Sequence, residues 1–209
     1  MTNALPWIAA LALLASACAS SPQATFYTLA ARQPQERPQA AGSVRISIDS
    51  VSVPDLVDRP QIVTRVDATQ VNIEEFARWA DPLEAQITRV LAADLAQSVP
   101  GALASGNLAW EAADETYHVS VDILSFESAP GSMASIAALW TVRALKSGEP
   151  VSGRSMVHEP TDGQGYDALV QAHSRALATV SSDIARAIET MRVSGGKRPV
   201  QARPVEGRR

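Results

Sequence analysis

The chain has 209 residues and a formal net charge of -4, and this length fits one or two domains. With 46% hydrophobic and 19% charged residues, it has enough apolar side chain for a packed core, and disorder throughout is excluded. The acidic balance argues against a nucleic-acid binder, which needs a basic surplus to neutralise phosphate, and one cysteine with three histidines excludes an intrachain disulfide and a Cys- or His-rich metal cage.

Residues 1–17 have the pattern of a secretory signal. An apolar stretch from Ala4 to Leu14 leads through small residues to Cys18, the only cysteine of the chain. Such a stretch is too short to span a bilayer. A small residue followed by a cysteine resembles the lipobox of bacterial lipoproteins, in which the cysteine is lipidated and becomes the first residue of the mature chain. Ala15 stands where Leu is usual in that motif, so an ordinary secretory signal is the alternative.

A lipidated tether and linker are predicted over residues 18–43. Phe26 to Leu29 is a short apolar and aromatic run that predicts a strand, and the Pro- and Gln-rich stretch from Ala30 to Ser43 is typical of an exposed linker. Ala19 follows the cysteine, where an Asp retains many Gram-negative lipoproteins in the inner membrane. The absence of that Asp favours the outer membrane.

The main domain is predicted over residues 44–193 and begins with β structure. Val44 to Val53 alternates strictly between apolar and polar residues, which is typical of a half-buried strand. Gln61–Val66 and Val71–Ile73 are predicted to pair as a hairpin around the turn at 67–70.

A helix is predicted to begin at Asp81. Asp81 is the expected N-cap, Pro82 suits the first helical position, and Glu84 completes a capping box. Pro100-Gly101 ends the helix. Apolar residues recur at helical spacing and form one stripe. These residues are Leu83, Ile87, Val90, Leu91 and Leu95.

The second half of the domain repeats the order of strands followed by a helix. Tyr117–Ser125 alternates, Met133–Arg143 is its predicted antiparallel partner, and a short strand is predicted at Arg154–His158, after a turn at 147–150. A second helix is predicted over about Tyr166–Met191. Its apolar stripe consists of Leu169, His173, Leu177, Val180, Ile184, Ile188 and Met191.

Residues 194–209 form a predicted disordered tail, with five basic residues against one acidic residue. The remaining order of elements predicts a single α/β domain, in which two long amphipathic helices pack on a mixed β-sheet.

No motif of the chain predicts catalysis or a cofactor. Gly163–Ala168 matches G-x-G-x-x-A, but no strand follows the helix, so a βαβ unit cannot close and a simple turn is predicted. Nucleophile elbows and H-E-x-x-H motifs are absent. His118 and Asp122 share a strand face about 13 Å apart, too far for a hydrogen bond. His173 on an apolar stripe is typical of a core or interface residue. The sequence therefore predicts a protein that is not an enzyme, with no metal.

Polar and aromatic residues before the first helix are candidates for contact with a partner. Pro60 favours an extended Arg59, and Arg59 and Arg65 share one face if the segment is extended. They can bind an anionic partner or pair with Asp55 and Asp58. Trp79 is either a hydrophobic plug over the helix end or an interface anchor. The candidate interface residues are Asp58, Arg59, Pro60, Gln61, Arg65, Arg78, Trp79 and His173.

Four segments, in this order after the cysteine, resemble the ABC-type transport auxiliary lipoproteins, the PqiC-like family. They are Phe26–Leu29, Leu56–Arg65, Arg78–Leu83 and Ala168–Ser174 with Leu177-Ala178. The resemblance spans residues 18 to 190, and its most specific block is Asp58–Arg65. The basic tail after Met191 departs from what the family needs.

The resemblance implies an α/β domain similar to the N-terminal domain of TolB, with an anticodon-binding-domain-like fold. It also implies a non-enzymatic accessory lipoprotein on the periplasmic face of the outer membrane, in an MCE-, Pqi- or ABC-type lipid transport system that supports envelope integrity. The implied partners are a periplasmic MCE-domain protein and further copies of the chain in a ring. The alternative is a structural envelope lipoprotein that binds another complex or peptidoglycan.

Overall fold

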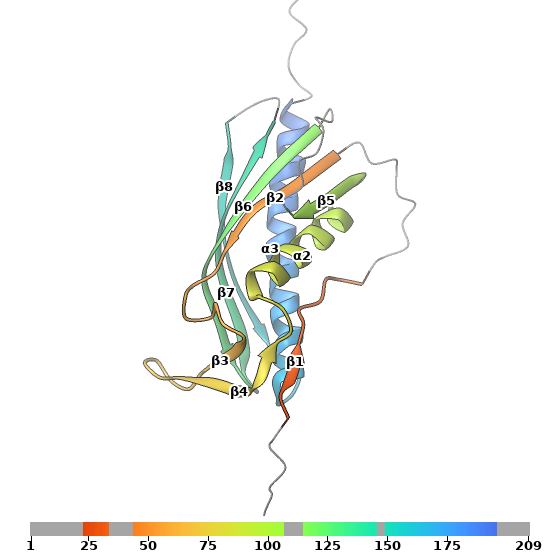
Figure 1. The fold of residues 1–209 in the computed structure, drawn as a ribbon. Coiled ribbons are helices and arrows are strands. Elements are labelled where there is room, and N and C mark those ends of the chain that lie inside the picture. The colour runs from red at the N-terminus through yellow and green to blue at the C-terminus, as the bar shows by residue number, and fades with distance from the viewer. Residues whose placement is uncertain (1–22, 34–43, 107–114, 146–148, 196–209) are drawn as a thin grey trace, which may run out of the picture.

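The computed structural model describes residues 23–33, 44–106, 115–145 and 149–195 (Figure 1). The signal peptide, Cys18, the Pro-rich part of the linker, the first two residues of the predicted turn at 147–150 and the tail from residue 196 lie outside the described residues. The described residues form an α/β domain with two helices, as predicted.

The larger sheet has five strands in the order β5-β2-β6-β7-β8. β2 pairs in parallel with β5 and β6, whereas β6, β7 and β8 are antiparallel, so the sheet is mixed as predicted. The strands are β2 (Val44–Ser52), β5 (Ala102–Gly106), β6 (Glu115–Ala129), β7 (Met133–Ala144) and β8 (Val151–Pro160).

A second, three-stranded sheet was not predicted as a separate unit. Its order is β1-β4-β3, with β1 (Thr25–Tyr27) parallel to β4 (Val71–Trp79) and β4 antiparallel to β3 (Gln61–Arg65). The predicted hairpin is confirmed, and the Asp67 carboxylate holds its turn by accepting the N–H groups of Thr69 and Gln70. β4 is longer than predicted, because a bulge in its pairing with β3 interrupts the alternation.

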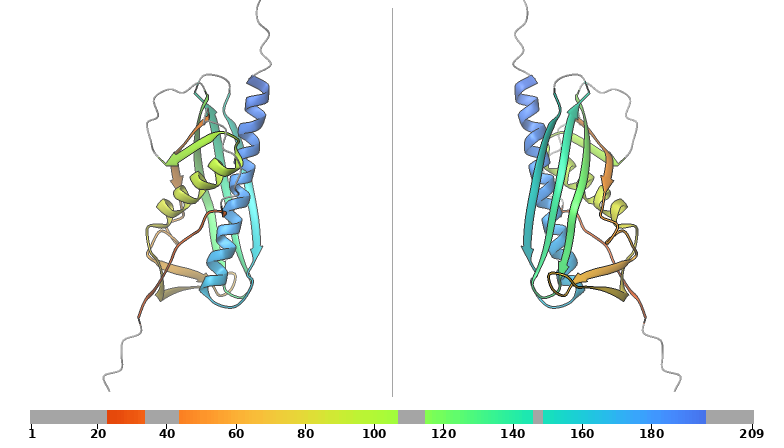
Figure 2. Two further views of the ribbon diagram at one scale, coloured as in Figure 1. Left: turned by 90° about the vertical axis from the view of Figure 1, so that its right-hand side faces the viewer. Right: turned by 90° about the vertical axis from the view of Figure 1, so that its left-hand side faces the viewer.

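Helices α2 (Leu83–Ser98) and α3 (Tyr166–Gly195) cover one face of the larger sheet (Figure 2). The predicted stripes are confirmed: every residue of both is buried, except Met191, which is partly buried. α2 packs on β2 and β5, and α3 packs on β7 and β8. Inward residues of these strands, such as Ile46 and Val142, are fully buried. Burial of each such side chain contributes about 1.5–3 kcal/mol.

The predicted capping box at Asp81 is wrong. The N-cap of α2 is Pro82, no side chain caps the helix, and Gln86 donates its N–H to the Pro82 carbonyl. Asp81 forms an exposed ion pair with Arg89 instead, at 3.3 Å. The extended backbone of Pro82 places the Asp81 side chain one residue too far from the helix to cap it.

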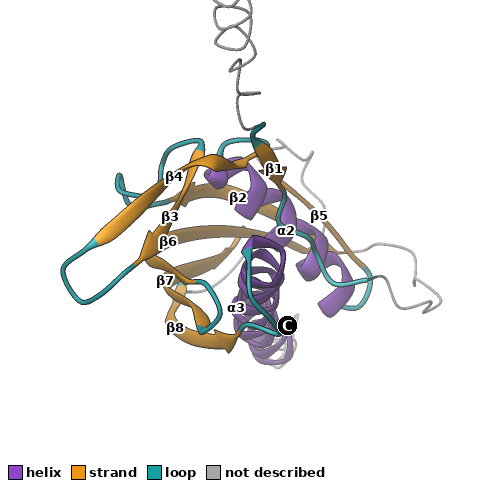
Figure 3. Ribbon diagram, turned by 90° about the horizontal axis from the view of Figure 1, so that it is seen from below, coloured by secondary structure: helices purple, strands orange, loops and turns teal. Residues whose placement is uncertain are grey.

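Figure 3 looks at the end of the domain where β1, the β3–β4 hairpin and the first turn of α3 lie together. The hairpin extends outward from the body of the domain. α3 starts at this end and finishes at the opposite end of the domain (Figure 1).

Candidate functional site

The most specific sequence block, Asp58–Arg65, forms the turn after β2 and the whole of β3. The Pro54 carbonyl accepts the N–H groups of Val57 and Asp58, which closes a tight turn. Pro60 has no N–H and a fixed φ, and its carbonyl accepts the Trp79 N–H at 2.7 Å. The block is therefore fixed to the end of β4, immediately before α2.

Arg65 connects the two sheets. Its guanidinium lies 2.9 Å from the Glu127 carboxylate on β6, and both side chains are partly exposed. The alternative that Arg65 pairs with Asp55 or Asp58 is thus not realised. Because the pair is exposed to water, it contributes at most about 1 kcal/mol.

The Arg59 backbone N–H donates to the Val57 carbonyl at 2.9 Å, but the Arg59 side chain has no partner among the described residues. It lies in the turn outside β3, so it does not share a strand face with Arg65 as expected. Its Nε is buried without a hydrogen-bond acceptor, and no ion pair within the described residues involves it. A buried donor without an acceptor costs about 1–3 kcal/mol. The partly buried guanidinium is thus the least satisfied cation of the block.

Gln61 and Arg78 occupy paired positions on β3 and β4. The Arg78 guanidinium donates to the Glu75 carbonyl at 2.8 Å and reaches the Glu75 carboxylate at 3.4 Å. Asp58 and Pro60 are exposed. Together with Arg59 and Arg65, these residues form one candidate region along the turn, β3 and the end of β4.

Two of the predicted interface residues are buried within the chain, and this corrects their assignment. Trp79 is 4% exposed and packs edge-on against Phe126, with ring centroids 6.1 Å apart. His173 is fully buried and stacks on the same phenylalanine, Phe126, with ring centroids 3.9 Å apart. The aromatic row therefore joins β4, β6 and α3 from inside, and neither side chain is available to a partner.

His173 is held as a neutral imidazole. Its Nε2 lies 2.8 Å from the Ser128 hydroxyl, and its Nδ1 has no partner among the described residues. Burial lowers the pKa of His173 from 6.5 to about 3. Phe126, which stacks on it, follows a bulge in β6, so the alternation in the sequence gave no signal of this contact.

The chain from Thr25 to Gln33, here called the N-terminal segment, is bound to both helices. Leu29 donates its N–H to Oε1 of Gln86 at 2.7 Å, and Arg32 donates its N–H to Oδ1 of Asp94 at 2.8 Å. On α3, the Ser174 hydroxyl accepts the Ala30 N–H at 3.1 Å. Ala30, Arg32 and Gln33, the first described residues of the predicted linker, are exposed as expected, but hydrogen bonds hold this stretch to the helices.

Sequence reasoning missed the two buried polar residues of α2 that bind this segment. Gln86 and Asp94 are both fully buried, and burial raises the pKa of Asp94, partly offset by the Arg32 N–H and the Ser181 hydroxyl. They are eight residues apart beside the apolar stripe. A polar side chain on the buried face of a helix needs a partner, and this pattern was the available signal.

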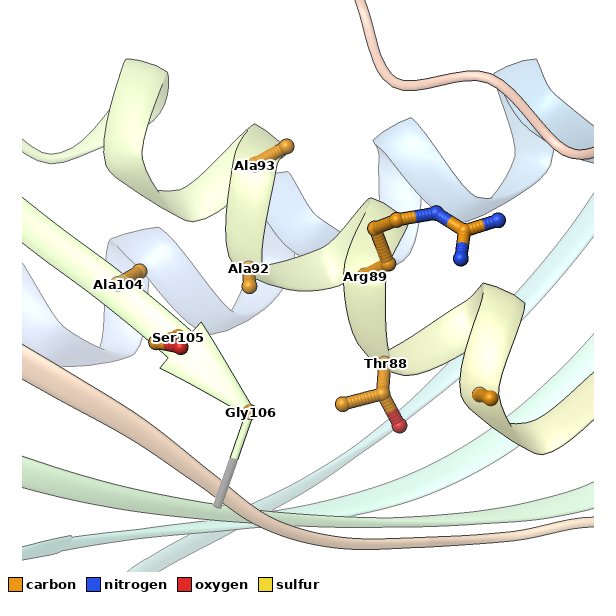
Figure 4. A pocket seen from close by; sticks show the side chains of 8 residues that line it. Thr88, Arg89, Ala92, Ala93, Ala104, Ser105 and Gly106 are labelled. Carbon is orange, nitrogen blue, oxygen red and sulfur yellow. The ribbon is translucent and has the colours of Figure 1, made fainter. Parts of the chain in front are cut away.

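A shallow pocket of about 500 Å³ lies between α2 and β5 (Figure 4). Alanines make up half of its lining, and its one charged residue, Arg89, pairs with Asp81. No group of His, Cys, Asp and Glu side chains within the described residues has the geometry of a metal site. In that same part of the chain, no helix is both long and apolar enough to cross a membrane.

The family of ABC-type transport auxiliary lipoprotein components matches residues 27–185 of the chain. No curated protein matches it. Among solved structures, a crystal structure of an uncharacterized protein is similar with a TM-score of 0.64 and 20% identity, over 79% of this chain and 99% of that one. Protein XCC0632 from Xanthomonas campestris, of the family DUF330, is similar with a TM-score of 0.62 and 20% identity, over 83% of this chain and 100% of that one. At this identity, both likenesses concern the fold alone.

Proposed function

Because the chain belongs to the family of ABC-type transport auxiliary lipoprotein components, we propose that it is the outer-membrane accessory lipoprotein of a lipid transporter. A lipid on Cys18 anchors it at the periplasmic face. The candidate region, made of Asp58, Arg59, Pro60, Gln61, Arg65 and Arg78, binds a periplasmic MCE-domain protein or a neighbouring copy of the chain in a ring. The protein acts by binding and positioning and not as an enzyme.

The observation that carries the proposal is the state of Arg59. The family match includes the whole candidate region, and within that region the Arg59 guanidinium has a buried Nε without an acceptor. A guanidinium recognises carboxylates and phosphates through paired N–H groups. An acidic group of a partner that reaches Arg59 would accept a hydrogen bond from this unsatisfied donor. The free energy gained would strengthen binding.

Co-purification from membranes in mild detergent, followed by mass spectrometry, tests the proposal. We expect the native chain to recover an MCE-domain protein, and Cys18→Ala to lose or weaken that recovery. Arg59→Ala is expected to reduce recovery without lowering the free energy of unfolding, because it removes an unsatisfied donor and breaks no side-chain contact within the described residues. Arg154→Ala on β8 is the matched control, since Arg154 is an exposed arginine outside the candidate region.

Two results would count against the proposal. Recovery of peptidoglycan or of an unrelated envelope complex, without an MCE-domain protein, would favour a structural lipoprotein. Unchanged recovery with Arg59→Ala would remove the candidate region from the proposal. Native mass spectrometry of the same samples reports whether the chain forms a ring.

A further inference from the structure

We propose that the end of the domain formed by β1 and β4 lies against the membrane surface, with Phe26 and Phe76 inserted among zwitterionic lipids. This inference rests on the lipidation of Cys18, which is part of the proposed function, and adds a second membrane contact to it. The two phenylalanines are called the Phe patch below.

Both side chains of the Phe patch are exposed on the smaller sheet. Phe26 is 62% exposed and Phe76 is 52% exposed. In the parallel pairing of β1 with β4, Phe26 lies opposite Arg78, and Phe76 lies two residues before Arg78 on the same strand. The two phenylalanines therefore come from neighbouring strands at one end of the domain.

The position of the anchor selects a membrane as the occupant of this patch. Thr25 follows Cys18 by seven positions, and seven residues reach at most about 25 Å even when fully extended. Thr25 is the first residue of β1, one residue before Phe26. A lipid on Cys18 therefore restricts the Phe patch to a thin layer next to the bilayer.

The hydrogen bonds of the N-terminal segment prevent this end from turning away. Leu29, Ala30 and Arg32 donate their N–H groups to side chains of α2 and α3. The residues that follow β1 are thus bound directly to the two helices, so the domain cannot rotate freely about the tether. The end of α3 lies on the far side of the domain (Figures 1 and 2).

Tethering converts a weak contact into a populated one. Two exposed aromatic side chains bind a bilayer weakly by themselves, but a short tether holds them at a high effective concentration near the lipid. The charged side chains next to the patch are paired, Glu75 with Arg78 and Asp81 with Arg89. Because these pairs leave no surplus of basic charge to attract anionic lipids, the patch needs only zwitterionic ones.

The test uses an environment-sensitive fluorophore on a cysteine introduced into the lipidated full-length chain. The acylated Cys18 no longer has a free thiol, so Phe26→Cys or Phe76→Cys gives a single labelling site. Val193→Cys is the matched control: Val193 is 63% exposed and lies near the end of α3. The probe membrane is a vesicle of phosphatidylethanolamine and phosphatidylcholine.

We expect the labels at residues 26 and 76 to brighten severalfold and shift to the blue in vesicles, and the label at residue 193 to stay unchanged. A flexible Gly-Ser insertion after Pro22 is expected to reduce the signal, because it lowers the effective concentration. Labels at 26 and 76 that respond no more than the one at 193 would overturn the proposal, as would a response that requires an added MCE-domain protein.

The mass of the purified chain separates this proposal from the proposed function. An unlipidated Cys18 would overturn both the anchoring and the membrane contact. A lipidated chain that recovers its transport partner but shows no response at residues 26 and 76 would overturn the membrane contact alone.

Discussion

The fixation of the N-terminal segment depends on Gln86, and we expect Gln86→Ala to detach it. Gln86 is fully buried; it accepts the Leu29 N–H at 2.7 Å and donates to the Asp81 carbonyl at 2.9 Å. The substitution leaves the Leu29 N–H and the Asp81 carbonyl without their partner. Leu29 itself is 5% exposed, so water does not readily replace the lost bond.

Loss of the buried bond to Leu29 is expected to lower the free energy of unfolding by about 1–3 kcal/mol, the cost of an unsatisfied buried group, and the part-buried bond to Asp81 adds less. Gln97→Ala is the matched control. Gln97 donates to the carbonyl of Arg32 at 2.9 Å, but this bond is exposed, so its loss is expected to cost about 1 kcal/mol or less.

Urea unfolding of the Cys18→Ala chain measures both costs without lipid, and hydrogen exchange of the Leu29 amide reports local detachment. We expect Gln86→Ala to abolish protection of that amide and Gln97→Ala to retain it. Equal losses of stability in the two variants, with Leu29 still protected, would refute the reasoning that a buried side chain holds the segment.

Three further predictions concern the core and the sheets. His173 has a pKa near 3 in the folded chain against 6.5 when unfolded; the unfolded state therefore binds the proton first, and stability falls by about 2 kcal/mol between pH 6.5 and 5. The urea midpoint of the native chain is expected to fall across this pH range, and that of His173→Phe is expected to stay level. The same dependence of the midpoint on pH in both chains would contradict the prediction. Gly153→Ala is expected to cost about 1–3 kcal/mol, because its Cβ would lie 2.2 Å from the Trp140 ring, and thermal unfolding that stays at the native temperature would contradict this. Arg65→Ala is expected to cost at most about 1 kcal/mol by urea unfolding, because its ion pair with Glu127 is exposed; a larger loss would mean that the pair is a principal link between the sheets.

The elements that the sequence predicted well are those whose burial repeats with a regular period. The stripe of α3 and the alternation of Val119, Val121 and Ile123 on β6 each report one buried face. β5 was missed because Ala102–Gly106 consists, apart from Leu103, of small residues and shows no regular contrast between its two faces. The end of β4 was missed because a bulge shifts its register.

The side-chain roles were harder to predict, because they depend on contacts between distant elements. Trp79 and His173 both pack against Phe126 on β6, which is distant from each of them in the sequence. Arg65 pairs with Glu127, which is 62 residues away, and no local pattern indicates that choice. By contrast, the turn of the Asp58–Arg65 block follows from local chemistry, since Pro54 and Pro60 fix the chain direction.

The polar residues of α2 explain how a domain with a short N-terminal tether keeps a defined orientation. If the N-terminal segment were held only by its apolar side chains, it could slide along the two helices, because hydrophobic contacts are not directional. The bonds from Leu29 to Gln86 and from Arg32 to Asp94 fix its register on α2. Burying a carboxylate such as Asp94 disfavours its charged form and raises its pKa. The Arg32 N–H offsets this cost only if it lies opposite the Asp94 carboxylate, so the position of the N-terminal segment on α2 is fixed. The direction of β1 is fixed with it, and so is the orientation of the Phe patch and of the candidate region relative to the anchor.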